Sequence, residues 1–134
     1  MLKKGTELEH NKQYIEASNF YFEALDRKNT NVDATIALNR VGKIVLNQYL
    51  NEFYKEEALG NSKSAVYAYL KADDYQKKLN KYKVYESIPD HYVEKYKSVK
   101  GTYLQNLYEE GENLMEALKY KNAENNFIEI LKFD

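Results

Sequence analysis

The side chains that most often carry out catalysis are few and scattered in this chain. His10 and His91 are the only histidines, and neither stands in a His-x3-His or His-Glu-x2-His pattern. Metal binding and acid–base catalysis need several such groups converging on one place. The absence of cysteine excludes disulfides, thiol catalysis and cysteine–metal sites. We therefore expect no metal site, and we expect both histidines at the surface or at a helix end.

Serines, glycines and carboxylates give no stronger sign of an active site. No nucleophile-elbow pattern surrounds the serines at positions 18, 62, 64, 87 and 98. No phosphate-binding loop is formed by the glycines, which are scattered at positions 5, 42, 60, 101 and 111. A dense acidic stretch contains Glu109, Glu110, Glu112 and Glu116. A solvated helix face is the main interpretation of this stretch and a weak cation site the alternative, so we expect a protein without enzymatic activity or cofactor.

Charge is uneven along the chain although the net charge of the 134 residues is only −1. Residues 1–62 carry −1, residues 63–100 carry +4 and residues 101–134 carry −4. Lysines and tyrosines are interleaved in the basic middle, as single-stranded nucleic-acid binding can require. However, tyrosines at helical spacing are more typical of helix packing, and this stretch has no arginine. We therefore rank nucleic-acid binding behind other functions.

Tyrosine gives the better indication of function. The chain has 14 tyrosines, and nine of them lie between Tyr67 and Tyr108. A packed interior can satisfy only some of their hydroxyls. The others should reach the surface, where tyrosine is favoured in protein–protein interfaces.

Long helices are the elements that must position these residues. One proline and five glycines in the whole chain supply little turn chemistry, and apolar residues recur at steps of three and four. We expect helices at about 2–11, 14–27, 32–59, 91–119 and 122–132. Gly60 should end the third of these, Ser62 or Ser64 should cap the helix after it, and Asp90 should cap the one that follows Pro89. No apolar run approaches the ~18 residues of a membrane span, and no signal segment opens the chain.

Residues 62–87 allow two interpretations. The stripe Ala65, Ala68 (or Tyr69), Ala72, Tyr75, Leu79, Tyr82 has the spacing of one continuous helix. Asp73-Asp74-Tyr75 instead resembles the turn between two short helices, with Lys78 in place of a small residue in the second. The continuous helix is slightly favoured, and the helix–turn–helix remains open.

The two ends of the chain repeat each other. Seven positions near the N-terminus match seven positions 106 residues later: Gly5, Leu8, Tyr14, Ala17, Tyr21, Ala24 and Leu25 against Gly111, Leu114, Tyr120, Ala123, Phe127, Ile130 and Leu131. This pattern is typical of a packed helix pair that recurs in a stacked array.

The two copies resemble the tetratricopeptide repeat family, whose unit of about 34 residues is a pair of antiparallel helices. The glycines match the family's small position in the first helix, where the second helix packs closest. Tyr14 and Tyr120 match the aromatic that opens the second helix, and the later alanines and aromatics match its packing positions. The chain departs from the family at Ile130, which replaces an alanine, at Asn29, which stands where a proline is usual, and at Leu107, which replaces a tryptophan. The match covers roughly the first and last 30 residues, and the middle matches poorly.

The resemblance implies an all-α fold of antiparallel helix-hairpin repeats, an α-solenoid of six or seven helices with longer helices in the middle. Stacking such hairpins buries a seam that no single hairpin could bury alone. We expect residues 1–134 to form one domain and the array to continue beyond one or both ends. The cytoplasm is the default compartment, with export or envelope attachment as the alternative if a signal segment precedes this sequence.

The same resemblance implies a protein-interaction module with a superhelical concave face lined by the first helix of each hairpin. On that face we expect partner-binding residues, namely Thr6, Glu9, His10, Gln105, Tyr108, Glu112, Met115 and Glu116. Because these positions are rich in acids and aromatics, a basic or apolar peptide segment should suit them. The alternatives are a structural spacer or a self-assembly module that associates through its ends.

Overall fold

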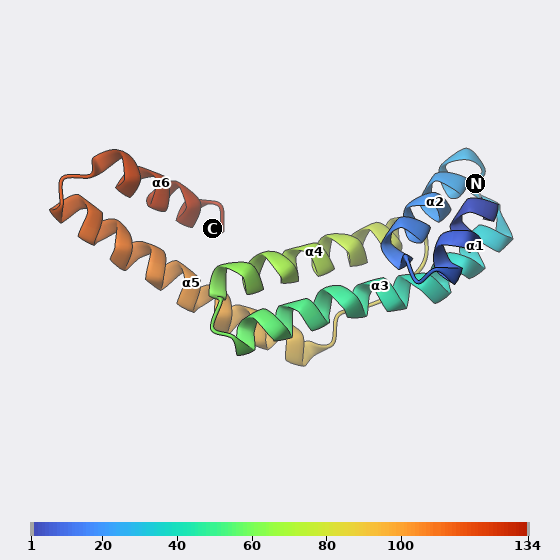
Figure 1. The fold of residues 1–134 in the computed structure, drawn as a ribbon, viewed down its shortest axis with the longest axis horizontal. Helices are drawn as coiled ribbons and strands as arrows, with labels where there is room; N and C mark the ends of the chain where they lie inside the picture. The colour runs from blue at the N-terminus through green and yellow to red at the C-terminus, as the bar shows by residue number, and fades with distance from the viewer. Residues whose placement is uncertain (1, 134) are drawn as a thin grey trace.

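The structure is a computed structural model that describes residues 2–133, and these residues form six helices and no strand (Figure 1). The helices are α1 (Leu2–His10), α2 (Tyr14–Arg27), α3 (Val32–Ala58), α4 (Ser62–Lys81), α5 (Asp90–Glu116) and α6 (Tyr120–Leu131). The predicted all-α fold, with its longer middle helices, is confirmed. Among the described residues, no helix has the length and apolar character needed to cross a membrane.

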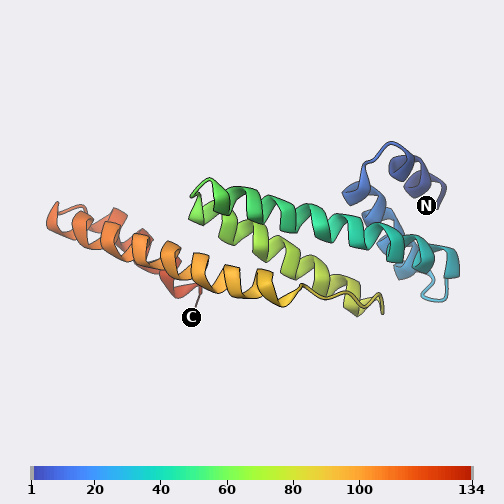
Figure 2. The same ribbon diagram turned by 90° about the horizontal axis from the view of Figure 1, so that it is seen from below.

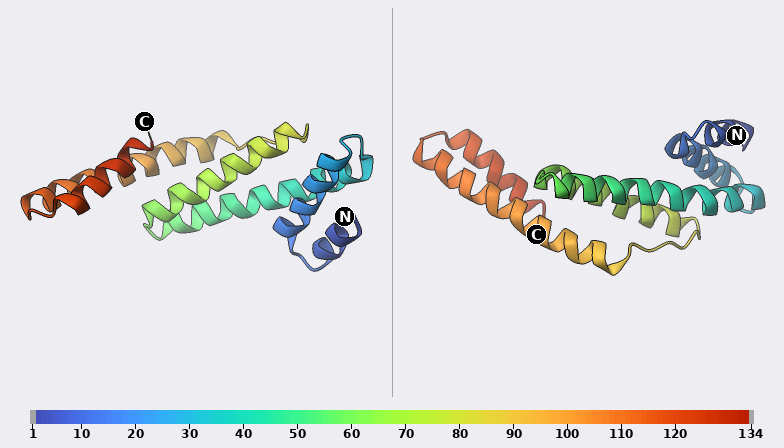
Figure 3. Two further views of the ribbon diagram at one scale, coloured as in Figure 1. Left: turned by 90° about the horizontal axis from the view of Figure 1, so that it is seen from above. Right: turned by 60° about the horizontal axis from the view of Figure 1, so that its bottom comes forward.

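The helices form three antiparallel hairpins, α1/α2, α3/α4 and α5/α6, arranged along an elongated molecule (Figure 1). Nearly all contact between helices joins neighbours in the chain, as in a solenoid. The views from above and below show the first hairpin at one end and α6 at the other (Figures 2 and 3). The molecule bends gently, with α4 and α6 on the inner side of the bend and α3 and α5 on the outer side (Figure 1). The second helices therefore line the inner side, where the first helices were expected.

All three hairpins turn in the same way. Two residues after the first helix of each ends, a residue with positive φ follows, and this φ is 61° at Lys12, 78° at Gly60 and 61° at Leu118. The next residue donates its backbone N–H to the carbonyl five positions earlier, at 2.8 Å, 2.9 Å and 2.8 Å respectively. This is the Schellman motif, in which glycine is the usual left-handed residue. Only one of the three turns has that glycine, so the other two carry no such signal in the sequence.

Aligning the hairpins on this turn shows a third copy of the repeat in the middle of the chain. Ala65 takes the place of Ala17 and Ala123, and all three are fully buried. Each donates its backbone N–H to the carbonyl of the residue that precedes the second helix. Four residues later stand Tyr21, Tyr69 and Phe127, and seven later stand Ala24, Ala72 and Ile130. The turns lie 48 and 58 residues apart, much more than the family's spacing, and the sequence comparison of the ends did not align this copy.

The small position of the repeat makes room for an aromatic ring. A Cβ atom on Gly5 would lie 2.6 Å from Cε1 of Tyr21, and one on Gly111 would lie 2.9 Å from Cε1 of Phe127. The glycines therefore admit the ring of the second helix, rather than the close approach of two backbones. In the middle hairpin the position is Phe53, whose ring meets that of Tyr69 edge-on with centroids 5.5 Å apart.

Several expected helix boundaries are corrected by the structure. The helix–turn–helix at Asp73-Asp74 is wrong, because α4 runs unbroken to Lys81. It stops there rather than at residue 87, and Lys83 takes a left-handed turn (φ 65°). The expected caps are wrong too, since Ser62 and Asp90 are the first residues of their helices and Ser64 lies further inside α4. The last helix begins at Tyr120, two residues earlier than expected.

The buried apolar residues form two clusters, and α6 contributes no described residue to either. The larger cluster joins α2, α3 and the end of α4, around residues such as Leu38, Val45 and Leu79. The smaller one joins the end of α3, the start of α4 and the middle of α5, around Phe53 and Tyr103. Within α6, only Ala123 is buried among the described side chains. Polar contacts must therefore carry a larger share of the attachment of α6.

Two glycines with opposite surroundings test the packing of the repeat. In Gly5→Ala, the new methyl group must displace the buried Tyr21 ring, which costs about 1–3 kcal/mol. The higher helix propensity of alanine offsets about 1 kcal/mol of this cost. In Gly101→Ala, no atom lies within 4 Å of the new methyl group, so we expect a gain of about 0.5–1 kcal/mol. Urea denaturation followed by circular dichroism measures both. Equal effects of the two changes would contradict the role assigned to Gly5.

Candidate functional site at the junction of α4, α5 and α6

A single carboxylate joins the last three helices. Glu129 of α6 accepts hydrogen bonds on Oε2 from the hydroxyls of Tyr67 on α4 and Tyr103 on α5, each at 2.5 Å. Its Oε1 lies 3.1 Å from Nζ of Lys132, and its side chain is only 16% exposed. Phe133 then packs edge-on against both tyrosine rings, with centroids 6.1 Å and 5.9 Å away. We call this arrangement of Glu129, Tyr67 and Tyr103 the carboxylate clasp.

The hydrogen bonds of the clasp shift the pKa values of its three groups. Hydrogen bonds from Tyr103 and Tyr67, with Lys132 nearby, lower the pKa of Glu129 to about 2. The hydrogen bond to Glu129 raises the pKa of Tyr67 to about 12. Burial and the same carboxylate raise the pKa of Tyr103 as well. At neutral pH Glu129 is therefore an anion that accepts hydrogen bonds from two neutral hydroxyls. A carboxyl group with so low a pKa is poorly matched to general acid–base catalysis.

A groove of about 770 Å³ opens beside the clasp. Its walls come from α4, α5 and α6 and include Ser62, Lys63, Tyr67, Tyr103, Asn106, Leu107, Glu110, Asn125, Asn126, Glu129 and Lys132. Asn126 donates to the backbone carbonyl of Leu107 at 3.2 Å, whereas Asn106 and Asn125 lie at the surface. We call this cavity the asparagine groove. It offers amide donors and acceptors beside aromatic rings, with two lysines and two glutamates at its walls.

A second groove of about 540 Å³ lies on the other side of Tyr67. Ile15 of α2, Tyr49 and Glu52 of α3 and Lys71 of α4 contribute to its walls. Tyr67 lines both cavities, so the two grooves meet at this residue.

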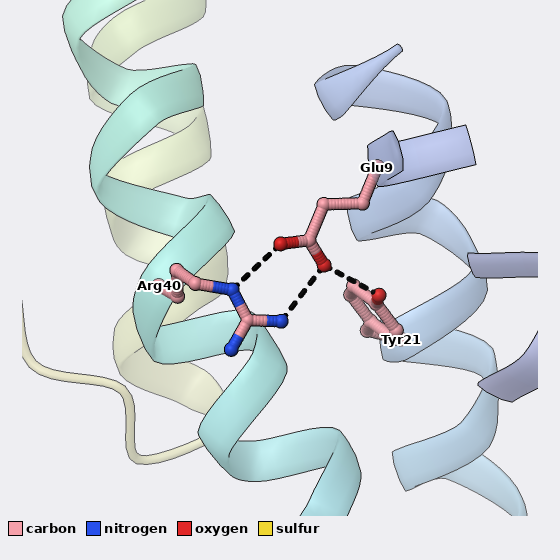
Figure 4. A network of polar contacts seen from close by, with 3 residues as sticks. All are labelled: Glu9, Tyr21 and Arg40. Carbon is pink, nitrogen blue, oxygen red and sulfur yellow. Dashed lines mark hydrogen bonds and ion pairs between the residues drawn. The ribbon is translucent and has the colours of Figure 1, made fainter. Parts of the chain in front are cut away.

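The N-terminal residues expected to bind a partner are largely engaged within the molecule. Glu9 receives Nε and Nη2 of Arg40 from α3 at 2.6 Å and 2.8 Å, and the hydroxyl of Tyr21 from α2 at 2.8 Å (Figure 4). The Arg40 hydrogen bonds lower the pKa of Glu9 despite its partial burial. Thr6 also interacts with Tyr21. Glu9 thus fixes α1 to α2 and α3. Of the expected N-terminal residues, His10 is the last residue of α1, and its side chain is exposed and is not part of this network.

The C-terminal residues of the expected set share one exposed side of α5, away from the asparagine groove. Gln105 follows Tyr103 by two residues, which is about 200° of rotation around the helix. Gln105, Glu112 and Glu116 are exposed, and so are Tyr108 and Met115. Tyr108 meets Phe127 edge-on at 6.2 Å, and a hydrogen bond to Glu112 raises its pKa. This group and the N-terminal group lie at opposite ends of the molecule, so they do not form one site (Figure 1).

Metal binding has no support in the geometry of the described residues. Among residues 2–133, no three histidine or carboxylate side chains gather as metal ligands would. The ring of His91 lies against Tyr92 and Tyr54, with centroids 4.3 Å and 6.2 Å away.

Sequence reasoning missed the clasp and the asparagine groove. Tyr67 and Glu129 are 62 residues apart, and no local spacing connects them. The density of tyrosine between Tyr67 and Tyr108 was the available signal, and Tyr67 and Tyr103 belong to that set. The asparagines at 106, 125 and 126 carried no pattern of their own.

The clasp should make stability depend on pH at both extremes. The folded pKa of Glu129 lies below its usual 4.5, so its stabilisation is complete above about pH 4.5 and is lost as pH falls toward 2. The folded pKa of Tyr67 lies above its usual 10.0, so its contribution holds below pH 10 and is lost as pH rises through 12. We expect Glu129→Gln to flatten both changes and to lower the free energy of unfolding at pH 7 by about 1–3 kcal/mol.

Urea midpoints across the pH range measure this prediction. Glu124→Gln is the matched control on the same helix, because its side chain is exposed and its ion pair is with Lys121 of that helix. If the urea midpoint of Glu129→Gln falls at acid pH as that of the wild type does, or as that of Glu124→Gln does, the role of the clasp is refuted.

Comparison of the chain with models of known protein families, with curated proteins and with solved structures finds no match. The resemblance to tetratricopeptide repeats therefore stays a prediction. The function has to be argued from the geometry of the helices and grooves.

Proposed function

We propose that this chain is a non-enzymatic protein-interaction module, which binds an extended segment of a partner protein in the asparagine groove. The observation that carries the proposal is the groove itself, with surface amides from Asn106 on α5 and Asn125 on α6 facing a common cavity. The resemblance to tetratricopeptide repeats, which commonly act as scaffolds, agrees with this function.

The chemistry of the groove suits a peptide backbone. Each asparagine amide offers both donors and an acceptor, as each peptide unit does. The rings of Tyr67 and Tyr103 supply apolar surface, while their hydroxyls are already satisfied by Glu129. A volume of about 770 Å³ falls in the usual range of ligand sites.

The charges of the groove are balanced, which bears on the choice of partner. Lys63, Lys132, Glu110 and Glu129 all line it, and Lys132 is paired with Glu129 at 3.1 Å. A strongly charged segment of either sign would meet repulsion as well as attraction. We infer that the partner segment is polar or of mixed charge, rather than the basic or apolar peptide that the outer side of α5 suggested.

Nucleic acid is a weaker candidate because several lysines in the basic middle of the chain are already paired with carboxylates. Lys77 pairs with Asp73 at 2.9 Å, Lys95 with Glu57 at 3.3 Å and Lys97 with Glu94 at 3.4 Å. Lys78 lies over the ring of Phe22, 4.3 Å from its centroid. These contacts spread the lysines over several helix faces instead of along one phosphate-binding track.

Two double variants locate the partner site. We expect a partner cross-linked to the wild-type chain in source-cell lysate to be lost, or bound at least tenfold more weakly, by Asn106→Ala/Asn125→Ala. Tyr108→Ala/Glu112→Ala, on the other side of α5, should retain it. All four side chains are exposed, so helicity should be unchanged in both.

The reverse pattern would place binding on the outer side of α5. Retention by both variants would contradict binding in the groove, and capture of no partner would favour the spacer alternative.

A further inference from the structure

The second helix of each hairpin has a face that points toward the next hairpin. On α2 this face contains Phe22 and Leu25, which are only 2% and 4% exposed. The ring of Phe22 meets the rings of Tyr75 and Tyr82 from the following hairpin, with centroids 6.0 Å and 4.9 Å away. Buried residues of α3 complete the same cluster.

The middle hairpin is covered in the same manner. Tyr69 of α4, the counterpart of Tyr21, is stacked on Tyr96 of α5 with centroids 4.0 Å apart and planes inclined by 10°. Val66, the counterpart of Ser18, is fully buried, and Leu70, the counterpart of Phe22, is partly buried in the same cluster. In both hairpins, the following hairpin provides the cover.

The corresponding face of α6 is uncovered. The counterparts of Phe22 and Leu25 are Ile128 and Leu131, which are 48% and 67% exposed. Tyr120 is exposed as well. We call Tyr120, Ile128 and Leu131 the α6 face, whereas the ring of Phe127 beside them fills the space that Gly111 leaves open. Tyr120 and Leu131 lie about 160–180° around the helix from Glu129 of the clasp, and Ile128 lies about 100° from Glu129 and about 60° from Asn125, near the edge of the asparagine groove.

We propose that the α6 face is a docking site for an amphipathic helix of a partner protein, distinct from the asparagine groove. The covered hairpins indicate which helix would fit. The sequence of α6, with Phe127, Ile128 and Leu131, resembles that of α2, which has Tyr21, Phe22 and Leu25, more than that of α4, which has Asp73 at the third position. The helix that follows α2 presents a stripe of small and branched aliphatic residues, namely Ala34, Ala37, Leu38 and Val41. The partner helix should carry a similar stripe.

The charge of Glu124 further restricts which helix could dock on the α6 face. Glu124 lies at the position of Ser18, which is fully buried between α2 and its neighbours. Glu124 already lies 3.3 Å from Lys121, and its side chain is more than half exposed. Covering a carboxylate is costly unless a cation and hydrogen bonds accompany it. The docking helix should therefore place a lysine or arginine opposite Glu124, beside its aliphatic stripe.

A second copy of the chain fits this face less well. In a head-to-tail stack, α1 of the next copy would have to cover α6. The exposed side chains of α1 are polar or charged among residues 3–10, namely Lys3, Lys4, Thr6, Glu7 and His10. They offer no aliphatic stripe, so a partner protein is the better match.

The docking site can be tested with a peptide taken from this chain. The probe is a fluorescent, capped peptide of residues 31–47, which holds the α3 stripe together with Arg40 and Lys43. We expect saturable binding to the full chain by fluorescence anisotropy. Ile128→Glu/Leu131→Glu should weaken binding at least tenfold, because both side chains are exposed in the free chain and would be covered in the complex. A peptide with Leu38→Glu and Val41→Glu is the matched control and should not bind.

The contrary outcomes separate this site from the proposed function. No saturable binding, or equal binding by Ile128→Glu/Leu131→Glu, would overturn the α6 face as a docking site. Asn106→Ala changes the groove on α5 and leaves α6 intact, so it should bind the peptide as the wild type does, and loss in that variant would assign the peptide to the groove instead. A wild-type dimer in sedimentation velocity that Ile128→Glu/Leu131→Glu abolishes would assign the face to a second copy and overturn the choice of a partner protein.

Discussion

The second helix of each hairpin has one side that packs on its own first helix and another that only a neighbouring hairpin can cover. The first contact uses a buried alanine and an aromatic ring, as at Ala17 and Tyr21, with the ring filling the space that Gly5 leaves open. The second contact links one hairpin to the next through residues such as Phe22 and Tyr69. The elongated shape follows, because each hairpin is stabilised mainly by its neighbours in the chain. The exposed α6 face follows as well, because no hairpin follows α6 within residues 2–133.

Carboxylates tied to tyrosine hydroxyls reinforce both ends of the array. Glu9 binds Tyr21 and Arg40 at the N-terminal end, and Glu129 binds Tyr67 and Tyr103 at the C-terminal end. Both ties join a terminal helix to the middle hairpin, where less apolar area is buried than in the centre. Hydrogen bonds to an ion are stronger than those between neutral groups, so they offset part of that deficit.

The C-terminal half of the molecule therefore combines a polar groove and an apolar face that share one short helix. The groove is polar and lies beside a satisfied ionic network, as suits a segment that is recognised through its backbone. The α6 face is apolar, as suits a helix that buries a stripe of side chains. The N-terminal hairpin offers less, since Glu9 and Tyr21 are occupied by internal contacts.

The sequence by itself determined the all-α fold, the positions of the long helices and the repeat at the two ends, because helical periodicity and the glycine–aromatic pattern are local. It did not determine the turns at Lys12 and Leu118, where the left-handed residue is not glycine, nor the third repeat, which is displaced by long helical insertions. Only the tertiary structure decided where binding surfaces form. The clasp joins residues from three helices, and the exposure of Ile128 and Leu131 depends on the absence of a covering helix in the described structure, while the equivalent Phe22 and Leu25 are buried. Equivalent positions of the repeat are thus buried or exposed according to the helices that lie beside them, and a local sequence pattern does not contain that information.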